Sequence, residues 1–193
     1  PSTNFDSSTE YYVLIDPTAF DDTSSNSYTG INSTTALSFV TADTTNPTLS
    51  SSLPADDGLN VPIASNIILD FDENVDVESG NITIKTTSND STFEIIDVTS
   101  SLVTGSGSSR IVINPLKNLR PNVSYYLLID ATAFDDASGN SYAGISNKAS
   151  LNFITKKGKI FDKTVKTLIR NQTAAAISSV SYTHLTLPTT PVV

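Results

Sequence analysis

The chain has 193 residues, a formal net charge of −9 and no cysteine. This charge, with only 11 Lys and Arg residues, argues against the basic surfaces that bind nucleic acids or anionic membranes. The absence of cysteine excludes disulfides, thiolate metal sites and a cysteine nucleophile, and no apolar run reaches the roughly 18 residues of a membrane span.

The first predicted unit is residues 1–43, because most of this segment recurs later in the chain. Residues 11–43 align without a gap with residues 125–157, 114 positions further on, and 19 of the 33 pairs are identical. A period of this length is typical of whole domains in series, whereas solenoid repeats span about 20–50 residues. We therefore expect residues 1–43 to be the C-terminal half of a preceding repeat.

The second predicted unit, residues 44–157, is a complete repeat in which apolar and polar residues alternate. Ile82 and Ile84, for example, are separated by Thr83, so one face of that strand is expected to be buried and the other solvated. Turn-forming residues separate the alternating segments. The pattern predicts an all-β fold, an immunoglobulin-like antiparallel β-sandwich. The predicted strands are Thr48–Leu53, Asn66–Phe71, Asn81–Thr86, Phe93–Val98, Arg110–Asn114, Ser124–Ile129 and Leu151–Thr155.

Residues 158–178 differ in pattern and predict a short C-terminal helix. Phe161, Val165 and Leu168 recur at helical spacing with basic residues between them. An isolated helix of this length is marginal in water. We therefore interpret this segment as a helical linker.

The last segment, residues 179–193, resembles a translated sequencing adaptor, which would encode Val180 to Thr189. We interpret it as a non-native tail. This interpretation removes His184, the sole histidine of the chain, and with it the imidazole that acid–base catalysis at neutral pH most often uses.

Six sequence features follow one another in order between Asn46 and Thr155. They are an acidic turn with Pro54, Asp57 and Gly58, the pair Val61-Pro62, a strand ending in Asp70-Phe71, a Leu-x-Pro segment before Tyr125, the turn Asp136 to Asn140, and a closing strand with Phe153 and Thr155. This order resembles the bacterial Ig-like domains of S-layer proteins and large adhesins. The resemblance implies a spacer, adhesive or structural module on the cell surface or outside the cell.

Acidic and amide side chains cluster in the part of the sequence that is repeated. They are Asp130, Asp135, Asp136 and Asn140, and in the first copy Asp16, Asp21, Asp22 and Asn26. Four oxygen donors within eleven residues suit calcium, but the same side chains suit Asx turns, and the run lacks the alternating acids of an EF-hand loop. Both interpretations stay open, and the structural turn is favoured.

The two copies of this turn differ at one position, where the first has Ser25 and the second Gly139. Glycine adopts a left-handed conformation without strain, and serine does not. We therefore expect the first turn either to use a different φ at Ser25 or to rely on Asn26.

Two further hypotheses concern acids outside the turn. A second acidic group lies at the end of one strand and in the loop after it, where charge more often blunts an edge than binds a metal. Calcium bound at the junction between repeats, around residues 41–47, could instead make that junction rigid with acids from both copies. The second acidic group consists of Asp70, Asp72, Glu73, Asp76 and Glu78.

Catalysis is not expected. The chain has no G-x-S-x-G elbow, and adjacent acids such as Asp135 and Asp136 point apart instead of facing each other across a cleft. Tyr125, Tyr126 and Tyr142 could line a contact face for carbohydrate or protein, but packing in the core is favoured.

The leading hypothesis is a non-catalytic structural or adhesive repeat of a large bacterial cell-surface or secreted protein. Its expected partners are neighbouring Ig-like repeats of the same chain and, beyond them, a surface protein or carbohydrate. Any export signal is expected to lie outside this sequence. The alternative is an accessory module of a secreted hydrolase whose catalytic domain lies elsewhere.

Overall fold

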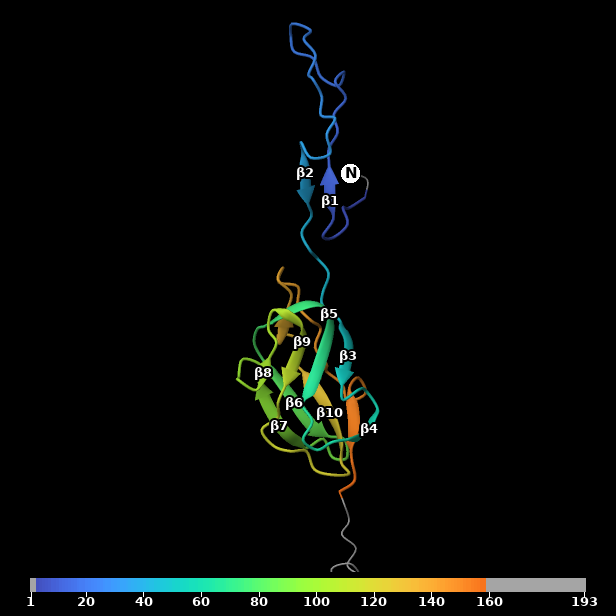
Figure 1. The fold of residues 1–193 in the computed structure, drawn as a ribbon, viewed down its shortest axis with the longest axis vertical. Helices are drawn as coiled ribbons and strands as arrows, with labels where there is room; N and C mark the ends of the chain where they lie inside the picture. Colours follow the sequence, from blue (N-terminus) through green and yellow to red (C-terminus); the bar gives the residue numbers. More distant parts are fainter. Residues whose placement is uncertain (1–2, 159–193) are drawn as a thin grey trace, which may run out of the picture. The chain divides into compact units, whose positions relative to one another are not determined.

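The computed structural model describes residues 3–158, and within that range the chain is all β (Figure 1). Apart from Gly158, the predicted helix at 158–178 and the tail at 179–193 lie outside the described residues. The described residues contain no helix with the length and hydropathy needed to cross a membrane.

The strands of the described residues are short, with one exception of 11 residues. They are β1 (Glu10–Tyr12), β2 (Ser38–Val40), β3 (Leu49–Leu53), β4 (Gly58–Val61), β5 (Ile67–Val77), β6 (Asn81–Thr86), β7 (Thr92–Asp97), β8 (Val103–Thr104), β9 (Ser108–Ile113), β10 (Ser124–Ile129), β11 (Phe134–Asp135) and β12 (Asn152–Thr155).

Strands β3 to β12 form two sheets that pack on one another. One sheet has the order β4-β12-β10-β6-β7, and the other has the order β11-β5-β9-β8, with β3 also paired to β5. The inward side chains of both sheets belong to one hydrophobic cluster. This arrangement is that of a β-sandwich, and it fits the predicted all-β fold.

The core follows from the alternation seen in the sequence. Leu69 on β5, Ile84 on β6, Ile111 on β9 and Leu127 on β10 are fully buried, and their strand neighbours are more exposed. Because successive side chains of a strand point to opposite faces, each sheet contributes one apolar face to the interior. Burying such aliphatic side chains provides most of the stability of the sandwich.

Two predicted strands agree with the structure residue by residue, and others were not foreseen. Strands β6 and β10 span the residues predicted for them. Strands β4, β8 and β11 were missed because they have only two to four residues, too few to show alternation. In addition, β4 pairs with β12 in parallel, so the sandwich is not wholly antiparallel.

Strand β5 is longer than its prediction, which ended at Phe71. The polar run Asp72 to Asn74 favoured a loop, but the strand continues to Val77. Its register against β9 shifts between Asp70 and Val75, which indicates a β-bulge. The bulge accommodates the polar residues without ending the strand.

The sandwich places its two chain ends at opposite ends of the domain. Strand β3 and then β4 run along the domain, and β4 lies parallel to the last strand, β12. The chain therefore enters at one end, before Leu49, and leaves at the other, after Thr155 (Figure 1). This connection allows consecutive domains to follow one another in line.

The first segment, residues 3–43, has the local structure of the second half of the sandwich. Strand β1 pairs with β2 in a register that sets Tyr11 opposite Phe39. Strand β10 pairs with β12 in the register that sets Tyr125 opposite Phe153. The repeated sequence therefore has a repeated backbone arrangement.

The turn that differs in sequence between the copies has the same backbone conformation in both. Ser25 has a φ of 63° and Gly139 a φ of 82°, so the expectation of a different φ at Ser25 is wrong. The side chain of Asn26 donates to Asp22 at 2.8 Å, which is a bond that holds the turn. Ser25 thus occupies a conformation that glycine adopts more readily.

Candidate metal centre

The candidate site begins with Asp136, which follows β11 and is 6% exposed. Its Oδ1 accepts hydrogen bonds from the backbone N–H groups of Ser138 and Asn140, both at 2.8 Å. Its Oδ2 accepts a bond from the side-chain amide of Asn140, also at 2.8 Å. These bonds form an Asx-type turn, in which a carboxylate replaces a backbone acceptor.

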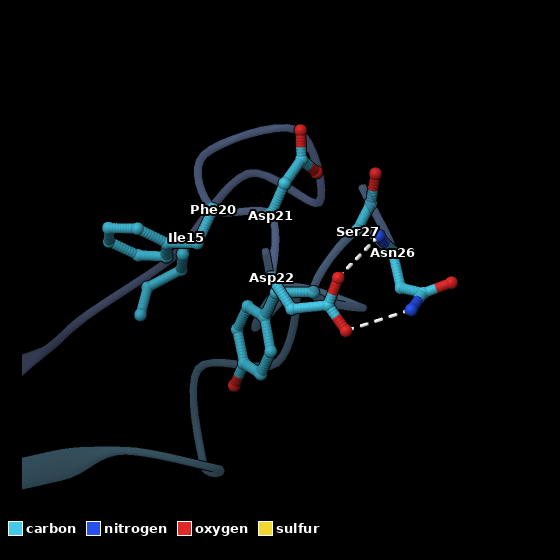
Figure 2. Close-up of a pocket in the computed structure, with 7 residues that line it drawn as sticks. Ile15, Phe20, Asp21, Asp22, Asn26 and Ser27 are labelled. Atoms are coloured by element: carbon cyan, nitrogen blue, oxygen red, sulfur yellow. Dashed lines mark hydrogen bonds between the residues drawn. The ribbon is translucent and has the colours of Figure 1, made fainter. Parts of the chain in front are cut away.

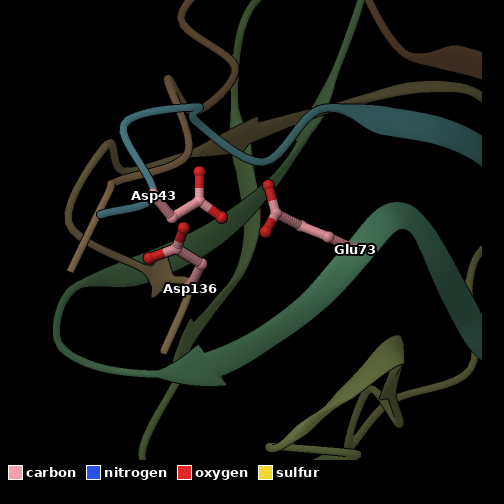
Figure 3. A group of neighbouring side chains, drawn as sticks. All are labelled: Asp43, Glu73 and Asp136. Carbon is pink, nitrogen blue, oxygen red and sulfur yellow. The ribbon is translucent and has the colours of Figure 1, made fainter. Parts of the chain in front are cut away.

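Asp136 faces two other carboxylates at the end where the chain enters the sandwich. Asp43 lies in the segment between β2 and β3, and Glu73 lies in the bulge of β5. One oxygen of each carboxylate lies within 4.8 Å of the others, and Figure 3 shows the three side chains converging. Two oxygens bound to one calcium ion at 2.3–2.6 Å lie at most about 5 Å apart, so this spacing fits the ion.

Hydrogen bonds hold Asp43 in its ionised form. Its Oδ1 accepts from the hydroxyl and the backbone N–H of Thr45, at 2.6 and 3.0 Å, and from the hydroxyl of Ser7 at 2.9 Å. These bonds lower the pKa of Asp43 to about 2, with the Thr45 hydroxyl contributing most. The carboxylate is therefore charged at neutral pH.

The pKa values of Asp136 and Glu73 are shifted in opposite directions. Burial raises the pKa of Asp136, but hydrogen bonds from Asn140 and Ser138 outweigh it, so the net pKa is lowered. The pKa of Glu73 is raised, first by burial and then by repulsion from Asp136 and Asp43. A divalent cation among the three oxygens would remove that repulsion.

A backbone contact connects this group to the junction before the sandwich. The side-chain amide of Asn140 donates to the backbone carbonyl of Asp43 at 3.3 Å. The backbone N–H of Thr44 in turn donates to the hydroxyl of Ser7 at 2.9 Å. Asp43 therefore lies within the predicted junction at residues 41–47, and Glu73 and Asp136 reach it from the sandwich.

The other residues of the predicted site in the second copy hold strands together. Oδ2 of Asp130 accepts the backbone N–H of Asn81 at 2.8 Å, at the start of β6. Asp135 lies on β11 opposite Asp76 and bridges to Ser141. Within residues 3–158, Asp136 is the one predicted ligand that belongs to the acidic group.

The first copy shows the same kinds of local bond. Oδ1 of Asp16 accepts the backbone N–H of Thr18 at 2.8 Å, and Asp21 bridges to Ser27. Oδ1 of Asp22 accepts the N–H of Asn26 at 2.8 Å. Calcium binding by either of these sets stays a prediction.

Sequence reasoning missed the position of Glu73 beside Asp43 and Asp136, and placed this residue among acids that blunt a strand edge. Its neighbours do have such structural partners: Asp70 pairs with Arg110 at 2.6 Å, and Asp72 accepts the N–H of Thr48 at 2.7 Å. A signal was present, however. The inward positions of β5 include Phe71 and Val75, and the period of two sets Glu73 between them on the same face.

Comparison with the curated proteins gives no match. Among solved structures, the chain resembles selenomethionine PcoC, a copper resistance protein from Escherichia coli, with 19% identity and a TM-score of 0.31, over 56% of this chain and 99% of that one. Residues 43–155 match the family of bacterial Ig-like domains. Because this match spans more than half of the sequence, the chain belongs to the bacterial Ig-like domain family.

Proposed function

We propose that this chain is a non-catalytic structural module of a bacterial protein displayed on the cell surface or secreted, in which Ig-like repeats follow one another in line. Domains of this family are typically non-catalytic surface modules. The proposed mechanism is geometric: each sandwich transmits tension and sets a distance. Its direct partners are the neighbouring repeats of the same chain.

The parallel pairing of β4 with β12 is the observation that supports this function best. Phe153 lies opposite Gly58 in this pair, and the backbone N–H of Lys156 donates to the carbonyl of Val61 at 2.8 Å. Because the chain enters and leaves at opposite ends, tension pulls these two strands along their own axes. Parallel strands loaded in this way are sheared, so their hydrogen bonds break together and not one at a time.

A side-chain contact reinforces the same pair of strands. Asp56 precedes β4, and its Oδ1 accepts the backbone N–H and the side-chain amide of Asn152, at 2.9 and 3.0 Å. Asn152 is the first residue of β12. Asp56 therefore joins the segment before β4 to the start of the last strand.

Single-molecule pulling of the 193-residue chain between two handles tests this function. Unfolding of residues 44–157 should release about 400 Å of extended chain in one discrete step. Asp56→Ala should lower the unfolding force, because it removes both bonds to Asn152. Asp57→Asn removes the adjacent charge and suits the positive φ of that position, so its force should not change.

Gradual extension without a discrete step would show that the sandwich bears no load. An equal loss of force in the Asp56→Ala and Asp57→Asn variants would show that the contact to Asn152 is not what resists tension.

We further propose that calcium binds to Asp43, Glu73 and Asp136 and makes the junction rigid. Support comes from the 4.8 Å spacing, the preference of calcium for carboxylate oxygens and the repulsion acting on Glu73. The position 114 residues after Asp43 is Lys157. The same three acids are therefore not expected at the following junction, and one ion should bind per chain.

Calorimetry with calcium and with a chelator tests this binding. Calcium at 100-fold above its dissociation constant should raise the Tm by about 10 °C or more. Glu73→Gln should abolish most of this shift, whereas Glu78→Gln, which changes an acid outside the group, should retain it. An unchanged Tm of the natural sequence in calcium would contradict the proposal.

A further inference from the structure

A cleft lies on the outer face of the sheet β4-β12-β10-β6-β7, over its central strand, β10. Tyr126 and Leu128 of β10 form its floor. They point away from the hydrophobic core, which contains Tyr125 and Leu127, because successive side chains of a strand face opposite sides. The cleft has a volume of about 310 Å³ and is called the loop cleft; it is lined by Lys85, Asp90, Tyr126, Leu128, Ser146 and Lys148.

Two loops form the walls of the loop cleft. One wall is residues 146–150, and the other is the loop between β6 and β7. Each loop is held by an Asx turn. Oδ1 of Asn147 accepts the backbone N–H of Ala149 at 3.0 Å, and Oδ1 of Asn89 accepts that of Ser91 at 3.3 Å. The cleft is therefore formed by the fold itself, as ligand sites usually are.

Tyr126 is buried beneath the loop cleft although it points away from the core. It is 4% exposed, and its hydroxyl donates to Oδ1 of Asp90 at 3.1 Å. Burial, followed by this hydrogen bond, raises the pKa of Tyr126, so the hydroxyl keeps its proton at neutral pH. The bond fixes Asp90 at the rim of the cleft, where its carboxylate can accept hydroxyl groups of a ligand.

Cations outnumber anions in the loop cleft, although the whole chain has a net charge of −9. Lys85 and Lys148 line it together with one acid, Asp90. Within residues 3–158, the ion pairs are Lys148 with Asp90, at 3.6 Å, and Arg110 with Asp70. Lys85 is partly buried, and it has no carboxylate partner among these residues. A partly desolvated ammonium without a counter-ion favours an anionic ligand.

The pockets of the first segment have no cation. At the place that matches the loop cleft, a pocket of about 300 Å³ is lined by Glu10 and Thr34 among others, and Thr34 stands where the second copy has Lys148. The larger pocket of this segment, in Figure 2, contains Asp22 bonded to Asn26. Residues 1–43 contain neither Lys nor Arg. An anionic ligand is therefore expected on the complete repeat and not on the first segment.

We propose that the loop cleft binds a sugar that carries a carboxylate, with the ammonium groups of Lys85 and Lys148 pairing with the carboxylate and Leu128 contacting the sugar ring. Asp90 repels a bare anion but accepts hydrogen bonds from sugar hydroxyls. The volume of the cleft is near the lower limit for ligand pockets, about 300 Å³, which suits a single sugar unit.

This binding is separate from the mechanical role proposed above. The residues of the loop cleft lie outside β4 and β12, the strands expected to resist tension. Loss of sugar binding would therefore leave the unfolding force unchanged, and a chain that bears no load could still bind the sugar.

Titration of the isotope-labelled 193-residue chain with sodium D-glucuronate, followed by NMR of the backbone amides, tests this proposal. At constant ionic strength, the amide signals of Leu128, Ser146 and Lys148 should shift and saturate with a Kd on the order of 1 mM, as expected for one small ligand. D-glucose lacks the carboxylate and acetate lacks the ring, so each should bind at least about 10-fold more weakly.

Substitutions of the two lysines test their role. Lys85→Gln should weaken glucuronate binding about 10-fold, whereas Lys85→Arg keeps the charge and should retain binding. Lys148→Thr, which makes this position match Thr34 of the first copy, should also weaken it. Lys117→Gln changes an exposed lysine outside the cleft and should bind like the unsubstituted chain. The Tm should be the same in Lys85→Gln and Lys85→Arg.

Three results would overturn the proposal. The first is the absence of saturable shifts at about 20 mM glucuronate. The second is equal binding of glucuronate and acetate, because the cleft would then hold any small anion. The third is equal binding of glucuronate and glucose, or unchanged binding in Lys85→Gln, because the ammonium groups would then play no part.

Discussion

The hydroxyl of Tyr125 accepts a hydrogen bond from the backbone N–H of Arg120, 2.9 Å away, within the fully buried surroundings of the tyrosine. A second bond closes the same corner, since the hydroxyl of Thr155 donates to the carbonyl of Arg120 at 2.7 Å. The loop before β10 is therefore fastened to both β10 and β12.

Tyr125→Phe should destabilise the sandwich by about 1–3 kcal/mol, because the N–H of Arg120 loses its partner while it remains partly buried. Urea unfolding of the purified chain measures this cost. Tyr11→Phe removes the matching hydroxyl in the exposed corner of the first segment and should leave the midpoint unchanged; equal effects of the two variants would contradict this account.

The loss of unfolding free energy on truncating a core side chain should also differ between the two copies. Leu127 is fully buried and Val13, its counterpart, is 38% exposed. Leu127→Ala should cost about 2–5 kcal/mol of unfolding free energy through lost burial and the cavity left behind, whereas Val13→Ala should cost less than about 0.5 kcal/mol. Thermal unfolding of both variants provides the measurement, and a large loss in Val13→Ala would show that its face is covered.

Two glycines after β10 should respond differently to alanine. Gly144 has a φ of 73°, and an added Cβ would collide with the carbonyl oxygen of Ile129, whereas one at Gly139 would meet open space. Gly139→Ala should therefore cost about 1 kcal/mol for its positive φ alone, which Ser25 tolerates in the first copy. Gly144→Ala should cost at least twice as much in chemical denaturation, and a reversed order would contradict the structure.

The difference in stability between the Glu73→Gln variant and the unsubstituted chain should depend on pH. Burial and the neighbouring acids raise the pKa of Glu73, so the folded state binds this proton more tightly than the unfolded state. The stability that Glu73 contributes is present below its unfolded pKa of about 4.5 and is lost as pH rises through the higher folded pKa. In chelator, Glu73→Gln should therefore melt above the natural sequence at pH 7.

The difference between Glu73→Gln and the natural sequence should disappear at pH 4 or below, where Glu73 is protonated. Melting curves between pH 3.5 and 7.5 test this dependence. A constant difference over the whole range would show that the substitution acts through packing and not through charge.

The sequence predicted those parts of the fold that depend on local alternation. Strand β6 was located to the residue because Ile82 and Ile84 alternate with polar neighbours. The parallel pairing of β4 with β12 was missed, because it joins Gly58 to Phe153 across 95 positions of sequence and a local pattern carries no information on such pairing.

The acidic group of Asp43, Glu73 and Asp136 could likewise be predicted only in part from local sequence. The junction at residues 41–47 was predicted as a place for calcium, and Asp136 was predicted as a ligand. Their meeting with Glu73 depends on the bulge in β5, which brings together residues that are distant in sequence. The helix predicted at residues 158–178 lies outside the described residues, apart from Gly158.

The central claim is that a complete sandwich, residues 44–157, follows the uncovered second half of a preceding repeat, residues 1–43. Hydrogen exchange of matched amides in one sample of the 193-residue chain tests this claim most directly. The amides of Tyr125 to Leu128 should exchange only through global unfolding, while those of Tyr11 to Leu14 should exchange much faster, since a two-stranded hairpin is marginal alone. Equal, slow exchange at both sets would contradict the claim.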